Sequence, residues 1–131
     1  MIESIDLLRL DPSEISKNDT KDKLMSKIAS SSLAENNLYS IVINDSERIG
    51  YILFLLINGK KSIRSLYILP NHRGKGYSRI IYNSFFSEGE SEIYLDPNYD
   101  GYELMKSLAE SLGYSKSKNE DIKYEKLGKL D

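Results

Sequence analysis

The sequence contains no cysteine among its 131 residues. A chain without cysteine forms no disulfide, offers no thiolate to a metal and carries no cysteine nucleophile. A cytoplasmic location is therefore the expectation, and any covalent chemistry must use other side chains.

The sequence also lacks a strong excess of either charge. Eighteen Lys and Arg residues against twenty Asp and Glu residues give a formal net charge of −2, so no overall field attracts nucleic acid or an anionic membrane. No stretch reaches the roughly 20 apolar residues of a membrane span, and residues 1–7 lack the basic flank and apolar run of a signal peptide. We therefore expect neither a nucleic-acid partner nor a membrane.

The composition is that of an ordinary globular protein, with 40% hydrophobic and 29% charged residues. A chain of this length can bury enough surface to fold without covalent staples. We expect residues 1–131 to form a single ordered domain.

Capping signals predict two helices near the N-terminus. Residues 2–10 fit a short edge strand or a helical turn. Asp11 and Glu14 form a capping-box pattern around Pro12, so a helix is expected to begin near residue 12. Thr20 is the expected cap of a second helix. The apolar stripe of that helix consists of Leu24, Met25, Ile28 and Leu33.

Three apolar segments predict consecutive antiparallel strands. Residues 38–43 and 49–57 flank the turn residues 44–47 and form a hairpin. The second strand is apolar without alternation, which is typical of a strand covered on both faces. Asn58-Gly59 suits a type I′ turn, and residues 62–69 form the return strand.

A strand, two helices and a hairpin are expected in the second half. Pro70 ends the third strand, residues 71–76 form a loop, and a helix follows and stops near residues 87–89. Its expected sheet-facing residues are Tyr77, Ile80, Ile81, Ser84 and Phe85. Residues 92–95 are expected to return parallel to the preceding strand.

The last predicted helix begins at the capping-box segment Asp100-Gly101-Tyr102-Glu103, and Gly113 follows its C-cap. Its expected inner face consists of Leu104, Met105, Leu108 and Leu112. Residues 114–118 and 122–127 then pair as a final hairpin.

The loop Arg73-Gly74-Lys75-Gly76 carries the clearest chemical signal. Its glycines allow successive backbone N–H groups to converge at the start of a helix, where the helix dipole also favours an anion. A pyrophosphate fits there, with Arg73 and Lys75 adding charge at the rim. The tetrapeptide alone is equally consistent with a solvated basic turn, but the strand, loop and helix around it favour the anion site.

These residues resemble a known family. The segment Leu66 to Ser78 looks like motif A of the GCN5-related N-acetyltransferases (GNAT), written Gln/Arg-x-x-Gly-x-Gly/Ala. Arg73 and Gly76 match, and Ser78 stands where Gly or Ala is usual. Residues 108–114 resemble more loosely the ending of the family's fourth helix, Leu-Tyr-x-x-Leu-Gly-Phe.

The resemblance implies an α/β (α+β) fold with a mixed, mostly antiparallel sheet of six to seven strands and about four helices. It also implies an acetyl-CoA-dependent transfer of an acetyl group to a primary amine of a small molecule, peptide or protein, by direct attack in a ternary complex. A main-chain N–H near Ile68 would polarise the thioester carbonyl. The implied acetyl-CoA-binding residues are Leu66, Tyr67, Ile68 and Asn98 for the pantetheine arm and Arg73, Gly74, Lys75, Gly76, Tyr77 and Ser78 for the pyrophosphate.

The usual catalytic residues of the family are missing. The position of its general-base Glu is Ser62, in a segment 61–65 without a carboxylate, and the position of its general-acid Tyr is Ala109. An attacking amine must nevertheless lose a proton.

Other residues are therefore the candidates for proton transfer. Asp96 is the best-placed carboxylate, although a capping or turn role before Pro97 is the stronger explanation for it. Tyr102, or Tyr99 just before it, is the candidate acid, with packing as the alternative. His72, the only histidine, is interpreted as facing solvent.

Two other functions compete with catalysis. The missing Glu and Tyr suggest a coenzyme A-binding module that acts through protein contacts, whereas a nucleic-acid-binding loop finds little support in the net charge. The acceptor would be shaped by the N-terminal helices and the last hairpin, where Asp19, Asp22 and Glu35 either attract a cation or form solvated surface. A monomer and a homodimer are both consistent with the sequence.

Overall fold

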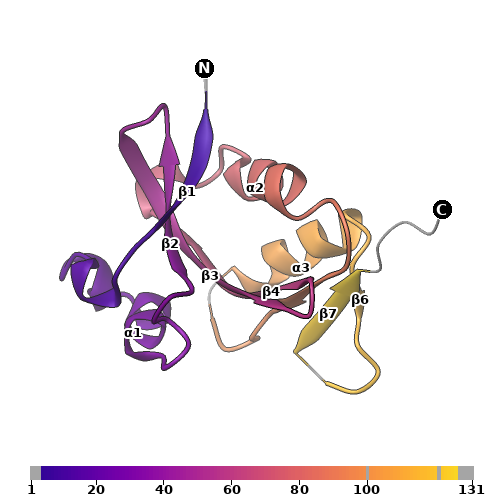
Figure 1. Cartoon of the computed structure of the whole chain (residues 1–131). Helices are drawn as coiled ribbons and strands as arrows, with labels where there is room; N and C mark the ends of the chain where they lie inside the picture. Colours follow the sequence, from indigo (N-terminus) through magenta and orange to yellow (C-terminus); the bar gives the residue numbers. More distant parts are fainter. Residues whose placement is uncertain (1–3, 100, 121, 127–131) are drawn as a thin grey trace. The chain divides into compact units, whose positions relative to one another are not determined.

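A computed structural model describes residues 4–99, 101–120 and 122–126. It contains a seven-stranded sheet with the order β1-β2-β3-β4-β5-β7-β6, in which β4 and β5 pair in parallel (Figure 1). The strands are β1 (Ile5–Arg9), β2 (Leu38–Ile43), β3 (Glu47–Ile57), β4 (Lys60–Ile68), β5 (Ser91–Tyr94), β6 (Ser115–Lys116) and β7 (Lys123–Lys126). The α-helices are α1 (Lys23–Ser30), α2 (Tyr77–Phe85) and α3 (Tyr102–Ser111). The predicted fold class is confirmed.

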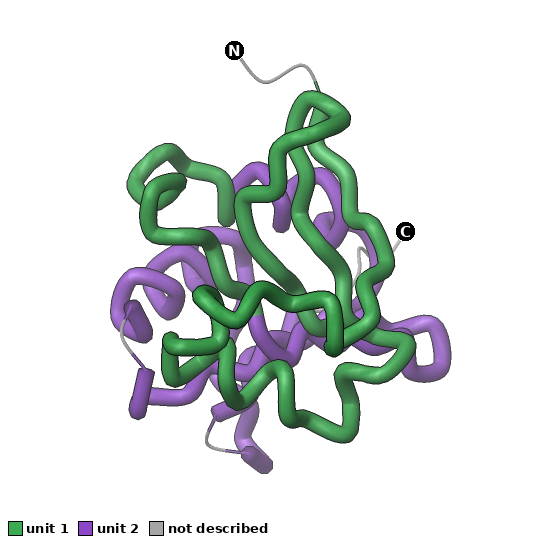
Figure 2. The backbone as a smooth tube through the Cα atoms, turned by 90° about the vertical axis from the view of Figure 1, so that its left-hand side faces the viewer, with its two compact units in different colours: residues 1–53, 66–78 green, residues 54–65, 79–131 purple. Residues whose placement is uncertain are grey.

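The chain forms two compact units, coloured separately in Figure 2. The first unit comprises residues 1–53 and 66–78, and the second comprises residues 54–65 and 79–131. Strands β3 and β4 and helix α2 each contribute residues to both units. The single domain expected over the whole chain stays a prediction.

Two 3-10 helices, Pro12–Glu14 and Asp19–Lys21, precede α1 in the first unit. The capping box at Asp11 is confirmed, because its carboxylate accepts the Ser13 N–H at 2.9 Å while Glu14 accepts the Asp11 N–H at 3.2 Å. It opens one 3-10 turn rather than an α-helix.

The prediction that Thr20 caps the second helix is wrong. The Thr20 hydroxyl donates to the Lys17 carbonyl at 2.9 Å. Asp22 occupies the N-cap of α1, where its carboxylate accepts the N–H groups of Leu24 and Met25. A carboxylate satisfies two free amides and also complements the helix dipole.

The N-terminal strands pair antiparallel and contribute to the core of the first unit. Residues 5–9 form an edge strand that pairs with β2, which settles the two alternatives left open by the sequence. The predicted hairpin of β2 and β3 is confirmed, with an irregularity in register between Ile41 and Val42. The buried core consists of Leu10, Ile15, Met25, Ile28, Ala34, Leu38, Tyr51, Leu53 and Tyr67, and Leu33 packs against it.

The turn between β3 and β4 is confirmed at Asn58-Gly59. Both residues have positive φ, 51° and 81°, as a type I′ turn requires. Strand β4 begins at Lys60, two residues earlier than the sequence predicted, because the short turn returns the chain directly into the ladder.

The predicted parallel return strand is confirmed in the second unit. Residues 61–63 of β4 pair with residues 91–93 of β5. Strand β5 also pairs with β7, and β7 with β6, both antiparallel. The predicted final hairpin is therefore confirmed with shorter strands, and Leu127 lies outside the described residues.

The predicted inner face of α2 is partly wrong. Ser84 is exposed, and Ile80 and Phe85 are only half-buried, whereas Tyr82 and Phe86 are fully buried. The Phe86 ring meets the Phe54 ring edge to face at 5.2 Å. Burying large aromatic rings outweighs the aliphatic stripe and sets the rotation of the helix.

The predicted inner face of α3 is wrong at Leu104, whose side chain is 78% exposed. Ala109 is the fully buried residue of this helix. At 100° per residue Leu104 lies about 140° from Ala109 around the axis, so it points outward. The predicted cap Asp100 lies outside the described residues, and Gly101 occupies the N-cap position.

Gly113 confirms the predicted end of α3, since it follows the C-cap Leu112 with φ of 96°. Over the ranges that the structure describes, none of the helices has the length and apolar character needed to cross a bilayer.

Candidate functional site

The loop between β4 and α2 has the backbone that the sequence predicted for an anion site. Gly74 and Gly76 are exposed and have φ of 77° and 80°, a region that other residues enter only with strain. A Cβ atom placed on either glycine would find no atom within 4 Å. Among the hydrogen bonds found within the described residues of the first unit, none uses the N–H groups of Gly74, Lys75 or Gly76. The loop therefore presents open, polar backbone just before α2.

Arg73 is held against the end of β4. Its Nε donates to the Ile68 carbonyl at 2.8 Å, and its guanidinium carbon lies 5.1 Å from the centre of the Tyr67 ring. The hydrogen bond and the contact with the Tyr67 ring restrict this side chain. Arg73 thus supplies a fixed positive charge beside the loop.

The carbonyl end of β4 is fixed by its neighbour β3. Leu69 donates its N–H to the Ile49 carbonyl at 2.8 Å. A Cβ atom on Gly50 would lie 2.2 Å from the Tyr67 carbonyl oxygen, so only glycine permits this approach of the two backbones. The backbone of residues 66–68, which the sequence assigned to the pantetheine arm, is therefore rigidly placed within the first unit.

Two buried tyrosines and the N-terminal acids form one cluster in the first unit. The Tyr51 hydroxyl donates to the Asp19 carboxylate at 2.6 Å. Burial, followed by this hydrogen bond, raises the pKa of Tyr51. Burial and the Asp22 charge likewise raise the pKa of Tyr67. Both phenols stay neutral at physiological pH, and Asp19 is engaged rather than freely solvated.

The interpretation of His72 as a solvent-facing residue is wrong. Its side chain is only 16% exposed, and its Nε2 lies 3.5 Å from a Glu47 carboxylate oxygen. Its ring also lies 6.3 Å from the ring of Tyr77. These contacts with Glu47 and Tyr77 explain why the His72 side chain is mostly buried.

The predicted catalytic carboxylate Asp96 has a turn role. It accepts the backbone N–H of Asn98 at 2.9 Å, which is the Asx-turn geometry that the sequence offered as its alternative. Asn98 itself is exposed. Both residues belong to the second unit, and their proposed contacts with proton and cofactor stay predictions.

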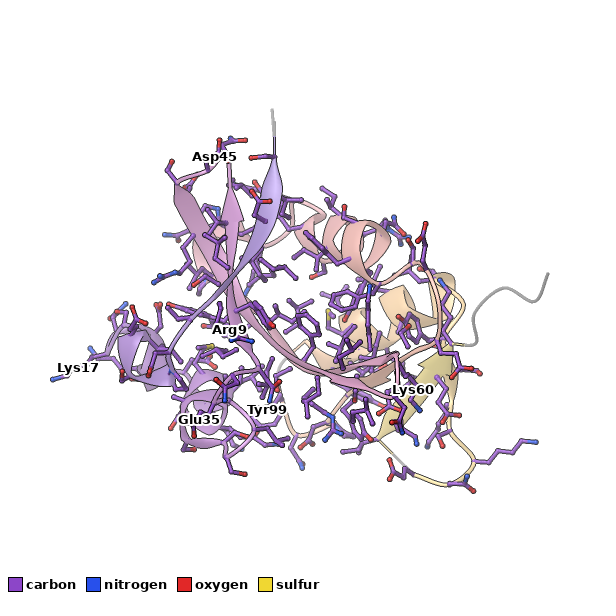
Figure 3. All side chains as sticks on the ribbon, in the orientation of Figure 1. Arg9, Lys17, Glu35, Asp45, Lys60 and Tyr99 are labelled. Carbon is purple, nitrogen blue, oxygen red and sulfur yellow. The ribbon has the colours of Figure 1, made fainter. Side chains whose placement is uncertain are left out.

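The predicted acid Tyr102 is half-buried at the start of α3. Its hydroxyl lies 3.4 Å from the hydroxyl of Tyr124 on β7. This hydrogen bond, followed by burial, raises the pKa of Tyr124 to about 12. The two phenols are therefore hydrogen-bonded to each other within the second unit. Tyr99, labelled in Figure 3, lies three residues earlier and is also half-buried.

The sequence missed a buried carboxylate beside Ser62. Register pairs Ser62 of β4 with Glu92 of β5, and the Ser62 hydroxyl donates to Glu92 at 2.7 Å. Lys60, labelled in Figure 3, forms an ion pair with the other Glu92 oxygen at 2.9 Å. The Glu92 side chain is 5% exposed. Strand β5 thus places a carboxylate next to Ser62, although residues 61–65 contain none.

Burial alone would raise the pKa of Glu92, but its hydrogen bonds to Lys60 and Ser62 outweigh that effect and lower it below the ordinary 4.5. A carboxyl group with a lowered folded-state pKa stabilises the fold above its unfolded pKa, and this stabilisation is lost as pH falls through the folded value. Glu92 is therefore ionised at neutral pH.

We expect Glu92→Gln to reduce the free energy of unfolding by about 2 kcal/mol near neutral pH, because a buried charge-assisted network loses its centre. The difference from the parent should shrink as pH falls below 4.5. Urea denaturation across this pH range measures it. Glu125→Gln, which alters an ion pair on a 44% exposed side chain, is the matched control and should cost far less. A pH-independent difference would contradict the assignment.

Comparisons with known proteins agree on the kind of domain. The model of the acetyltransferase (GNAT) family matches residues 3–114 of the chain. No curated protein sequence matches the chain.

Several solved structures share the fold. E. coli YhhK bound to coenzyme A has a TM-score of 0.60 and 18% identity, with 95% of this chain and 99% of that chain covered. The Bacillus cereus IAA acetyltransferase has a TM-score of 0.58 and 15% identity, with 87% and 79% covered. The PaiA N-acetyltransferase of Thermoplasma acidophilum in complex with coenzyme A has a TM-score of 0.54 and 14% identity, with 93% and 96% covered. At such identities the likeness is one of fold alone.

Proposed function

Since the chain belongs to the acetyltransferase (GNAT) family, we propose that it transfers the acetyl group of acetyl-CoA to a primary amine. The observation that carries the proposal is the pair of exposed, positive-φ glycines, Gly74 and Gly76, directly before α2. Backbone N–H groups in such a turn form a concave anion site, and the helix dipole adds to it. Coenzyme A carries a diphosphate that matches such a site.

The proposed cofactor contacts divide between the loop and β4. The loop residues Arg73, Gly74, Lys75, Gly76, Tyr77 and Ser78 hold the diphosphate, and the exposed Lys75 adds a positive charge. The backbone of Leu66, Tyr67 and Ile68 pairs with the pantetheine arm. Among the described residues, Ile63 is the last residue of β4 that pairs with β5. Strand β4 continues for five more residues, to Ile68. Asn98 is proposed as a further pantetheine contact from the family resemblance.

The proposed reaction needs two proton transfers. The acceptor ammonium loses a proton, its nitrogen attacks the thioester carbonyl carbon, the carbon–sulfur bond breaks, and the thiolate takes up a proton. We propose Asp96 as the water-mediated base and Tyr102 as the acid. The half-buried phenol of Tyr102 and its Tyr124 partner support the second assignment, since a linked pair can relay a proton. Orientation of the amine supplies further acceleration.

We expect Tyr102→Phe to lower kcat by roughly tenfold to a hundredfold, within the range of general acid catalysis. Acetyl-CoA affinity should stay nearly unchanged, because the phenyl ring keeps its packing. Thiol release at saturating acetyl-CoA measures the first quantity and calorimetry the second. Tyr99→Phe is the matched control, since it removes the hydroxyl of the alternative candidate. Equal turnover of parent and Tyr102→Phe would remove Tyr102 from the mechanism.

Calorimetry with acetyl-CoA and thiol release with a panel of amines and peptides test the proposed function. Binding with transfer supports an acetyltransferase, whereas binding without transfer to any amine favours the alternative of a coenzyme A-binding module. That alternative draws on Ser62 and Ala109, which replace the usual Glu and Tyr. Failure to bind acetyl-CoA would refute both. We also propose a cytoplasmic location, supported by the absence of cysteine.

A further inference from the structure

A chain of polar contacts runs along one face of β4 and β5 in the second unit. Lys60 pairs with Glu92 at 2.9 Å, Glu92 accepts from Ser62 at 2.7 Å, and Ser62 accepts from the Nε of Arg64 at 2.9 Å. The guanidinium carbon of Arg64 lies 4.4 Å from the centre of the Tyr94 ring. Each contact fixes the next, from Lys60 to the Arg64 head group.

This face is the one turned away from α2. Side chains alternate along a strand, so Lys61 and Ile63 point opposite to Ser62 and Arg64. The Lys61 ammonium reaches the Phe85 carbonyl at the end of α2, and Ile63 is fully buried. Ser62 and Arg64 therefore lie on the face of β4 opposite to the one that contacts α2.

Among the described charged residues of this series of contacts, Arg64 is the one without an oppositely charged partner. Glu92 is neutralised by Lys60, and both of its carboxylate oxygens are engaged. Within the parts of the chain that the structure describes, Arg64 has no carboxylate partner, and its recorded hydrogen bond uses only Nε. The guanidinium of Arg64 is half-buried, and it is restricted by its position over the Tyr94 ring and by the hydrogen bond from Nε, whereas its two terminal NH₂ groups form a planar fork of donors.

A guanidinium fork of this kind recognises planar acids. Two parallel N–H donors match the two oxygens of a carboxylate, and the stacked ring pre-organises the donors so that less side-chain entropy is lost on binding. Glu92 does not compete as the anion, because its oxygens are already satisfied and its side chain is almost entirely buried. An acid that pairs with the terminal NH₂ groups of Arg64 would therefore belong to a bound molecule.

We infer that Arg64 binds an acidic group of the acceptor, so that the acetylated substrate is an amine that also carries a carboxylate, as a free amino acid does. The inference rests on the proposed acetyltransferase function. Arg64 precedes Leu66, the first residue assigned to the pantetheine arm, by two positions on the same strand. Ser62 and Glu92 act as positioning residues for Arg64 and do not touch the substrate.

The inference is tested with acceptors that differ only in the acid. Free amino acids are compared with their carboxamides, and phosphoethanolamine with ethanolamine, for kcat/KM in the thiol-release assay. The parent should prefer each amino acid over its carboxamide by roughly tenfold to a hundredfold, as expected for hydrogen bonds to a charged group. Preference for phosphoethanolamine without a preference for the amino acids would overturn the carboxylate assignment.

Substitutions of Arg64 test whether this residue causes the preference for acidic acceptors. Arg64→Ala should abolish it by raising KM for the acids while leaving the carboxamides unchanged, and Arg64→Lys should restore only part of it, because lysine lacks the fork. Lys118→Ala, which removes an exposed positive charge beyond β6, is the matched control and should keep the full preference. Melting curves exclude unfolding of each variant.

Binding separates failure of this inference from failure of the proposed function. Calorimetric titration of the chain with each amino acid and carboxamide, with coenzyme A present and absent, does not require turnover. Equal affinity of acid and carboxamide, or an acid preference that survives Arg64→Ala, overturns the inference even if acetyl transfer occurs. Arg64-dependent acid binding without acetyl-CoA binding would sustain the acid site and refute the acetyltransferase.

Discussion

Gly76→Glu is expected to abolish acetyl-CoA binding. Residue 76 is exposed, and a Cβ atom there meets nothing within 4 Å, so the new side chain has room and its carboxylate enters the proposed diphosphate site. Two like charges about 4 Å apart near a protein surface repel by about 4 kcal/mol. Affinity should therefore fall by about a thousandfold, which calorimetry with acetyl-CoA measures.

The control for this prediction is Gly76→Gln, which has the same size without the charge. Any L-residue at φ of 80° costs about 1–2 kcal/mol of backbone strain, and this cost is common to both variants. Gln should therefore weaken binding far less than Glu, while both variants keep the circular dichroism of the parent. Unchanged affinity of Gly76→Glu would remove the loop from the cofactor site, and equal losses would assign the effect to strain alone.

Short-range patterns in the sequence were sufficient to predict the turns and the glycine loop. Asn58-Gly59 specifies its turn because both residues tolerate positive φ, and Asp11 forms its capping box with a residue three positions away. The same reasoning located the loop of Gly74 and Gly76 before α2. In each case the determining contacts lie within about four residues, so the sequence alone contains them.

Contacts between distant segments could not be predicted from the sequence. Ser62 and Glu92 meet because of the register of a parallel strand pair, which no short-range pattern fixes. The rotation of α2 depends on the fit of Phe86 against Phe54, a packing choice between two apolar faces. His72 was misjudged for the same reason, since its partner Glu47 is remote in sequence.

The sequence was therefore sufficient to predict the backbone of the loop, but not the side-chain contacts around it. The glycine loop and the end of β4 were found from residue type and order. The hydrogen bonds of Arg73 to the Ile68 carbonyl and of Arg64 to the Ser62 hydroxyl could not be predicted from the sequence. In the proposed function, recognition of the diphosphate would use local backbone geometry, whereas recognition of an acceptor would use side chains from different strands.

Gly50→Ala is expected to destabilise the first unit strongly and to weaken acetyl-CoA binding. A Cβ atom would lie 2.2 Å from the Tyr67 carbonyl oxygen, and the obstructing atom is backbone that no rotamer can move. Overpacking of this kind costs about 3 kcal/mol, which corresponds to a fall in melting temperature of about 10 °C for a domain of this size. Thermal denaturation followed by circular dichroism measures it.

Gly89→Ala is the matched control for this change. Gly89 has φ of 76°, and a Cβ atom placed on it would meet nothing within 4 Å, so alanine there costs only backbone strain of about 1–2 kcal/mol. Because β3 holds the Tyr67 carbonyl in place, Gly50→Ala should also weaken acetyl-CoA binding at temperatures where the variant is still folded, whereas Gly89→Ala should not. Equal stability losses in the two variants would show that β3 and β4 separate easily, and the backbone of residues 66–68 would then not be a rigid support for the pantetheine arm.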